Sequence, residues 1–350
     1  MSAAPTSLRV VATRVDERLR NFLSAERARW TDFDPDLVVP FGELERMVVG
    51  GGKRLRPTFT FWGFVGAGGE PEDPRIIDAG AAFELLHAFA LFHDDIMDGS
   101  STRRGSATTH ETMQAEHKSR QWSGDPRRFG DGAAILIGDL SFVYADALLA
   151  SLGPRGWEMW NELRIELNLG QYLDMLGSAQ NERRPDKAAR ICRYKSGKYT
   201  IERPLHLGAL LANEDTKLLA VYSDYGLPLG DAFQLRDDVL GAFGDTSVTG
   251  KPVGDDIREA KPTPLMALAL QLGSPVQREV LEKVGRVPLD ASGIARVQQA
   301  IVDSGALDEM EATITRLTVQ AIDAIGHAPI EMSVRDELVQ LAQYVSDRKV

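Results

Sequence analysis

The chain contains a single cysteine, Cys192, among its 350 residues. One cysteine cannot form an intrachain disulfide, and it cannot supply the several thiolates of a Cys-rich zinc site. The composition therefore favours a reducing compartment, and we expect a cytoplasmic protein.

An excess of positive charge is also lacking, since 40 Lys and Arg stand against 51 Asp and Glu and the net charge is −11. General nucleic-acid binding depends on clustered Lys and Arg that neutralise phosphates, so no nucleic-acid partner is expected. An anionic ligand would have to be met by a local basic group or by a metal ion.

Long apolar runs are missing as well. No stretch of about 18 apolar residues is free of charge, which predicts no transmembrane segment. The charges at Arg9, Arg14, Asp16 and Glu17 come too early for the apolar core of a secretory signal peptide, so none is expected. Hydrophobic residues make up 43% and charged residues 26%, which is ordinary for a folded protein.

Alternating strand-like segments are scarce, and apolar residues recur instead at three- and four-residue spacing, which predicts an all-α fold. The expected long helices cover residues 75–98, 130–152, 156–179, 216–243 and 305–326. Helices this long suggest a single large bundle formed by residues 1–350. Two polar stretches, 99–132 and 241–264, exceed what a bundle needs, and long loops in compact domains tend to carry function.

The first acidic cluster is HDDIMDGSSTRRG, residues 93–105. Asp94 and Asp98 are four apart and lie on one helix face, whereas Asp95 points about 100° away. Like charges at this spacing destabilise a helix by a few tenths of a kcal/mol unless a cation lies between them. A solvated helix end is the alternative, but the apolar run before the cluster weakens it.

The second acidic cluster is GDAFQLRDDVLGAFGD, with Asp237 and Asp238. Gly241 occupies the position that matches Asp98, and Asp245 is the next acid. Oxygen ligands without nearby His or Cys suit a hard cation such as Mg²⁺. Two acidic helix ends that face each other would hold a metal cluster, which in turn would hold an anion.

Basic residues are interleaved with the acids. GGGKRLRP, residues 50–57, places three glycines before Lys53, Arg54 and Arg56, a pattern that lets a backbone and forked guanidinium groups approach phosphate. A solvated basic turn is the ordinary alternative. Further cations are Arg103, Arg104, Lys195, Lys198, Lys251 and Lys261. The pattern fits a substrate with two or more phosphates, bound partly through metal and partly directly.

Six motifs resemble those of the trans-isoprenyl diphosphate synthases, or polyprenyl synthetases, in order and in rough spacing. They are GGGKRLRP, LLHAFALFHDDIMDGSSTRRG, GQYLD, YKSGKYT, FQLRDDVLGAFGD and GKPVGDDIREAKPTPL, and they span about residues 50–265. The resemblance implies an isoprenoid-synthase bundle with a central active-site cavity, and commonly a homodimer. It implies the condensation of isopentenyl diphosphate with dimethylallyl, geranyl or farnesyl diphosphate.

The resemblance also implies roles for individual residues. About three Mg²⁺ ions, for which Mn²⁺ is a possible substitute, would be held by Asp94, Asp98 and Asp237, with Asp238 behind them. The allylic diphosphate would contact Arg103, Lys195, Lys251 and, by a looser match, Lys261. Isopentenyl diphosphate would contact Lys53, Arg56, His87 and Arg104. The carbocation would face the carbonyl of Lys195, the hydroxyl of Ser196, where many relatives have Thr, and Gln234.

Product length depends on the residues about one and a half turns before Asp94, because the tail grows along that helix away from the metals. Phe89 and Ala90 stand there. One aromatic residue followed by Ala resembles synthases of the C20 product, geranylgeranyl diphosphate. A C15 or a longer product stays open, since a neighbouring helix or a dimer partner can also close the tunnel.

Two alternative functions remain, and so does a choice between two roles for Gln171 and Asp174. A terpene cyclase shares the acidic motif but needs no GGGKRLRP site for a second diphosphate. A silent partner subunit would have lost acids or basic residues that this chain retains. Gln171 and Asp174 lie on one helix face, where they either approach the metals or form a buried polar pair between helices.

Overall fold

The computed structural model describes residues 4–180, 182–213, 216–244 and 254–347. Within these ranges the chain is almost entirely helical, and the only strands are a two-residue antiparallel pair, β1 (Thr102–Arg103) and β2 (Ser106–Ala107). The predicted all-α fold is confirmed.

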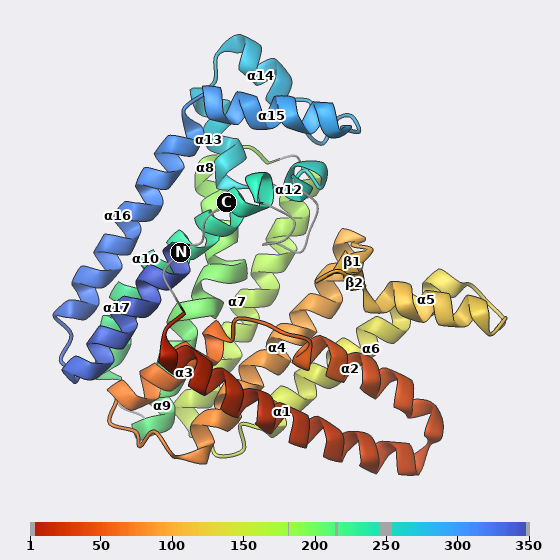
Figure 1. Cartoon of the computed structure of the whole chain (residues 1–350), viewed down its shortest axis with the longest axis vertical. Coiled ribbons are helices and arrows are strands. Elements are labelled where there is room, and N and C mark those ends of the chain that lie inside the picture. The colour runs from red at the N-terminus through yellow and green to blue at the C-terminus, as the bar shows by residue number, and fades with distance from the viewer. Residues whose placement is uncertain (1–3, 181, 214–215, 245–253, 348–350) are drawn as a thin grey trace.

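The helices form a bundle with peripheral elements (Figure 1). The long helices are α1 (Thr6–Phe33), α4 (Pro74–Asp98), α6 (Pro126–Ala147), α7 (Pro154–Ala179), α10 (Lys217–Phe243) and α16 (Ala306–Gly326). The shorter ones are α2 (Val38–Val49), α3 (Leu55–Gly66), α5 (Thr109–Ser119), α8 (Pro185–Cys192), α9 (Arg203–Asn213), α12 (Asp255–Arg258), α13 (Pro264–Leu272), α14 (Pro275–Leu281), α15 (Ala291–Asp303) and α17 (Met332–Ser346). A 3₁₀ turn, η1 (Pro35–Leu37), and a π-helical segment, η2 (Arg193–Glu202), complete the description.

Four of the five expected long helices agree with the structure to within two residues at both ends, and the fifth is shifted. Residues 130–152 were expected, but α6 begins at Pro126 because Asp125 caps it by accepting a hydrogen bond of 2.9 Å from the Arg127 amide. The polar stretch 99–132 is not one long loop, since it contains α5. The buried face of α5 is mostly polar, so hydrophobic periodicity did not reveal it.

Helix α4 runs through the core. It is the one helix in the described part of the chain that is long and apolar enough to cross a membrane, and 72% of that apolar window is buried inside the fold. Its buried residues include small side chains, such as Ala82, and large ones, such as Phe83 and Leu86. Burial on nearly all sides accounts for the apolar composition.

The buried apolar residues form three groups. Helix α4 belongs to a group of buried residues shared with α1, α2, α6 and α7, and α10 belongs to two others, shared with α17 and with α13, α15 and α16. The acid-bearing ends of α4 and α10 are therefore held by different parts of the core.

Helices α3 and α9 cross in direct backbone contact. A Cβ atom on Gly208 would lie 2.1 Å from the Thr60 carbonyl oxygen, and one on Gly63 would lie 2.3 Å from the Leu205 carbonyl oxygen. Only glycine permits so close an approach. Since α3 begins within the GGGKRLRP motif and α9 follows η2, this crossing holds two cation-bearing segments together.

Candidate active site

A cavity of about 540 Å³ opens between the carboxyl-terminal parts of α4 and α10. Its lining includes Asp94 from the first acidic motif and Asp237 and Asp238 from the second. Segments far apart in the sequence thus face one space.

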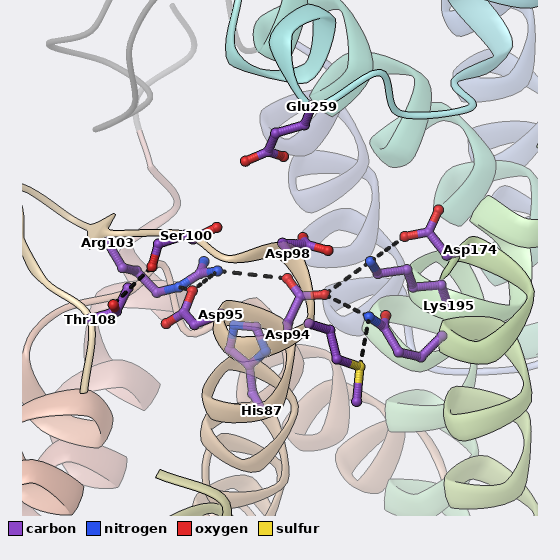
Figure 2. A network of polar contacts seen from close by, with 12 residues as sticks. His87, Asp94, Asp95, Asp98, Ser100, Arg103, Thr108, Asp174, Lys195 and Glu259 are labelled. Atoms are coloured by element: carbon purple, nitrogen blue, oxygen red, sulfur yellow. Dashed lines mark hydrogen bonds and ion pairs between the residues drawn. The ribbon is translucent and has the colours of Figure 1, made fainter. Parts of the chain in front are cut away.

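The part of the cavity next to the carboxylates of α4 and α10 is called the acidic wall. Asp94 lies there at the centre of a polar network (Figure 2). Its Oδ1 accepts hydrogen bonds from Lys195 Nζ at 3.1 Å and from Gln171 Nε2 at 2.9 Å. Lys195 also donates to Asp174 at 2.6 Å, so Gln171 and Asp174 both contact the acidic wall. Burial raises the pKa of Asp94, but the charges of Lys195 and Arg103 outweigh burial and leave that pKa below its ordinary value.

Asp98 lies one turn further along α4. Burial, followed by the charge of Asp94, raises the pKa of Asp98 to about 6. The Lys261 ammonium lies 4.0 Å from Asp98 Oδ2 and 3.4 Å from Asp256 Oδ1. A raised carboxyl pKa beside a second carboxylate marks a place where an added cation would be stabilised.

Asp95 orients the Arg103 side chain, a role that the sequence did not predict. Its side chain is buried, and its Oδ1 accepts a hydrogen bond of 2.7 Å from Arg103 Nε. The guanidinium also reaches 3.6 Å from Asp94 Oδ2, as Figure 2 shows. In the sequence, the one feature that set Asp95 apart was its direction on the helix, which differs from that of Asp94 and Asp98.

The second acidic motif contains an unsatisfied oxygen. Asp238 is buried, its Oδ1 accepts from Gln234 Nε2 at 3.2 Å, and its Oδ2 has no hydrogen-bond partner among the described residues. Burial, followed by the charge of Asp256, raises the pKa of Asp238 well above its ordinary value. A buried carboxylate oxygen without a hydrogen-bond donor destabilises the folded protein unless a cation lies close to it.

The donor set fits a hard divalent cation, although no metal cluster is preformed. Across residues 4–180, 182–213, 216–244 and 254–347, no three His, Cys, Asp or Glu side chains already converge as ligands. The ammonium groups of Lys195 and Lys261 lie among the acids instead. Carboxylate oxygens from two helices are the ligands that Mg²⁺ prefers.

The basic wall is formed by Lys53, Arg56, His87 and Arg104, all of which line the cavity. Arg56 donates to Thr200 Oγ1 at 3.1 Å, and its guanidinium carbon lies 4.1 Å from the centre of the Tyr199 ring. Burial, then the charge of Arg56, holds the pKa of His87 well below its usual range, so His87 is neutral. Concentrated positive charge in a cavity favours an anion.

Lys195, Ser196 and Thr200 line the cavity from η2. A π-helical segment makes wider turns than an α-helix and frequently occurs at functional sites. A Cβ atom on Gly170 would lie 2.5 Å from the Lys195 amide nitrogen, so α7 touches the backbone of η2 directly. Gln234 lines the cavity from α10, close to this segment in space.

The remaining predicted residues lie elsewhere. Phe89 and Ala90 are on α4 but outside the lining of the cavity. The ring of Phe89 lies 4.7 Å from the rings of both His93 and Phe142, the latter on α6. Lys251 and Asp245 fall outside the described residues.

Comparison with known proteins agrees with this geometry. The family model for polyprenyl synthetase matches residues 42–302. Geranylfarnesyl diphosphate synthase of Aeropyrum pernix is 31% identical over 317 residues, which cover 88% of this chain and 93% of the relative. Geranylgeranyl diphosphate synthase of Mycobacterium tuberculosis is 35% identical over 234 residues, 65% of this chain and 61% of that protein.

A solved structure shows the same fold. The crystal structure of geranylgeranyl pyrophosphate synthase from Corynebacterium glutamicum, complexed with isoprenyl diphosphate and magnesium, aligns with a TM-score of 0.90 and 36% identity over 96% of this chain and 98% of that chain. The fold and the two-walled cavity define an all-α prenyltransferase. The chain belongs to the polyprenyl synthetase family, as its six motifs predicted.

Proposed function

We propose that this protein is a cytoplasmic, Mg²⁺-dependent synthase that condenses isopentenyl diphosphate with allylic diphosphates and releases geranylgeranyl diphosphate. The observation that carries the proposal is one cavity with an acidic wall on α4 and α10 and a basic wall at the start of α3. Such a cavity suits two diphosphates, one bound through metal and one bound directly.

The acidic wall binds the allylic diphosphate. Asp94, Asp98 and Asp237, with Asp238 behind them, hold about three Mg²⁺ ions, for which Mn²⁺ can substitute. When bound, these ions neutralise the charge that develops on the leaving diphosphate. Arg103, Lys195, Lys251 and Lys261 add direct positive charge to the same phosphate groups. Asp95 keeps the Arg103 guanidinium oriented toward this wall.

The basic wall binds isopentenyl diphosphate through Lys53, Arg56 and Arg104, with His87 beside them. Neutral His87 fits this position because its Nδ1 already shares a hydrogen bond of 2.7 Å with the Tyr199 hydroxyl. A protonated ring would instead add charge next to Arg56 in a buried setting.

The allylic carbocation is stabilised by oxygen atoms rather than by a charged base. The Gln234 amide nitrogen donates to Asp238, so its carbonyl oxygen remains as an acceptor for positive charge. The carbonyl of Lys195 and the hydroxyl of Ser196 serve the same purpose from η2. The released diphosphate takes the final proton, and no protein base is required.

Phe89, followed by the small Ala90, limits the length of the product to C20. Phe89 lies outside the lining of the cavity, where its ring packs against Phe142 of α6. Its position on α4, before Asp94, supports the proposal that it meets a tail growing along this helix. Farnesyl diphosphate, the C15 product, is the second candidate, because a (2E,6E)-farnesyl diphosphate synthase of Mycobacterium tuberculosis is 28% identical over 352 residues, 98% of this chain.

Two other functions receive less support. A terpene cyclase handles one diphosphate and has no use for the basic wall of Lys53, Arg56 and Arg104. A silent partner subunit would not need the acids and cations that line this cavity.

Exposed apolar side chains on α6 and α7 support a homodimer. Leu136 on α6 is 70% exposed and Leu169 on α7 is 58% exposed. Val143 lies seven residues after Leu136, and Ile165 and Tyr172 flank Leu169 at helical spacing, so each helix presents an apolar strip. Apolar strips of this kind mark interaction sites, and a second copy of the chain is the partner proposed here.

The direct test is incubation with isopentenyl diphosphate and, in separate reactions, dimethylallyl, geranyl or farnesyl diphosphate plus Mg²⁺, with EDTA as the control. Mass spectrometry should show a C20 diphosphate from each primer and no product with EDTA. A largest product of C15 would overturn only the chain length. No consumption of isopentenyl diphosphate with any primer would overturn the synthase.

A further inference from the structure

The second acidic motif lacks a third carboxylate within α10, because Gly241 stands where Asp98 stands in the first motif. The space beside Gly241 is nevertheless filled. A Cβ atom on Gly241 would lie 1.9 Å from Asp256 Oδ2 and 2.5 Å from Asp256 Cγ. The carboxylate of another helix therefore occupies the place that a side chain at position 241 would take.

Asp256 comes from α12 and lines the same cavity as Asp237 and Asp238. Its two oxygens have different neighbours. Oδ1 lies 3.4 Å from Lys261 Nζ, whereas Oδ2 is the atom that lies against Gly241. Lys261 has a second acidic partner, since Glu259 Oε2 lies 2.8 Å from its Nζ. Neutralisation of Lys261 thus does not depend on Asp256 alone.

We propose that Asp256 supplies the third carboxylate of the second acidic motif, so that Asp237 and Asp256, from two different helices, together hold the divalent cation on this wall. The inference rests on the proposed function, because the cation is the one that the synthase would use. It explains why glycine is suited to position 241: any side chain there would displace the carboxylate of Asp256.

The test measures metal binding without turnover. Isothermal titration calorimetry with Mg²⁺ in the presence of inorganic diphosphate should show that Asp256→Asn raises the Mg²⁺ concentration for half-saturation by about tenfold or more. Glu259→Gln is the matched control, since it removes the other partner of Lys261 and should leave Mg²⁺ affinity within about twofold of wild type. Equal affinity of Asp256→Asn and wild type would overturn the inference.

A relocation variant separates a lost ligand from a disturbed fold. Gly241→Asp combined with Asp256→Ala moves the carboxylate onto α10, and Ala at 256 removes the three atoms nearest to a Cβ at 241. The double variant should bind Mg²⁺ more tightly than Asp256→Ala alone. If the folded double variant shows no recovery, the carboxylate is not a metal ligand.

The same titration distinguishes this inference from the proposed function. If wild type binds no Mg²⁺ with diphosphate and makes no product, the synthase function is excluded. The metal-binding role of Asp256 is then excluded as well. If wild type binds Mg²⁺ and elongates substrates while Asp256→Asn binds equally well, only the role of Asp256 is wrong.

Discussion

The guanidinium of Arg54 and the carboxylate of Glu84 form an ion pair inside the protein, where the two side chains are only 2% and 5% exposed. Arg54 also pairs with Asp16 at 2.8 Å and donates to the Val48 carbonyl at 2.8 Å. It thereby ties α1, the end of α2 and α4 to the GGGKRLRP motif. Arg54 thus anchors this motif to the core, and it lines the cavity together with Lys53 and Arg56.

Replacement of Arg54 should therefore destabilise the fold. Arg54→Met leaves the Glu84 charge buried without its partner, and we expect the free energy of unfolding to fall by about 3–5 kcal/mol in urea denaturation. Adding Glu84→Gln should recover part of this loss. Arg29, whose side chain is 66% exposed and pairs with Glu26, gives the control, since Arg29→Met should cost less than about 1 kcal/mol. An unchanged midpoint for Arg54→Met would contradict the structural role.

Removal of Asp94 should abolish most turnover while the fold survives. Asp94→Ala removes a proposed metal ligand and the partner of Lys195, and a loss of several kcal/mol in transition-state stabilisation corresponds to a fall in kcat of about 10²-fold or more. Steady-state kinetics with saturating Mg²⁺ measure this, with circular dichroism to check folding. Asp186→Asn, at an exposed position of α8, should keep the wild-type rate. A near-wild-type kcat for Asp94→Ala would argue against the metal role.

Shortening Phe89 should lengthen the products. Phe89→Ser removes the ring that packs against Phe142, so a growing tail can pass this point of α4. Mass spectrometry of the products should then show chains longer than C20. Phe33→Ser, at the exposed end of α1, makes the same chemical change away from the site and should leave product length unchanged. An identical product spectrum for both variants would reject the tunnel geometry.

Charge on the apolar strips of α6 and α7 should separate the proposed dimer. Leu136→Glu with Leu169→Glu places two carboxylates on each exposed strip, where a second copy would bury them without partners. Size-exclusion chromatography with light scattering should show monomers. Val276→Glu on α14 is an equally exposed control and should stay dimeric. If wild type itself elutes as a monomer, the homodimer is wrong.

His206 should make stability depend on pH. It is buried with its Nε2 2.9 Å from the Leu219 carbonyl oxygen, and burial, then the charge of Arg203, lowers its pKa to about 4 from the ordinary 6.5. As pH falls below 6.5, His206 is protonated in the unfolded chain but stays neutral in the folded protein. The free energy of unfolding therefore falls until pH reaches about 4. The contribution is on the order of 3 kcal/mol.

Urea denaturation at a series of pH values measures this effect. His206→Gln, which can still donate to Leu219, should show a smaller loss of stability between pH 6.5 and about 4 than wild type does. His327→Gln, at an exposed end of α16, should retain the wild-type dependence. Parallel curves for His206→Gln and wild type would exclude His206 as the titrating group.

Sequence patterns predicted the long helices well because helical periodicity is a local property. They did not predict η2, since nothing in YKSGKYT distinguishes a π-helical from an α-helical segment. They placed Arg54 in a basic motif but could not tell that it is buried, because its partners Asp16 and Glu84 come from α1 and α4. The approach of Asp256 to Gly241 depends likewise on how α12 folds back on α10.

The crossing of α3 and α9 at Gly63 and Gly208 has a consequence for redesign of the enzyme. Because main chain meets main chain there, no side chain sets the separation between the segment that carries Lys53 and Arg56 and the segment that carries Lys195. A side chain at Gly63 or Gly208 would push α3 and α9 apart and shift the cation-bearing segments relative to each other. Efforts to change the product of the enzyme should leave this crossing untouched and alter α4 around Phe89 and Ala90.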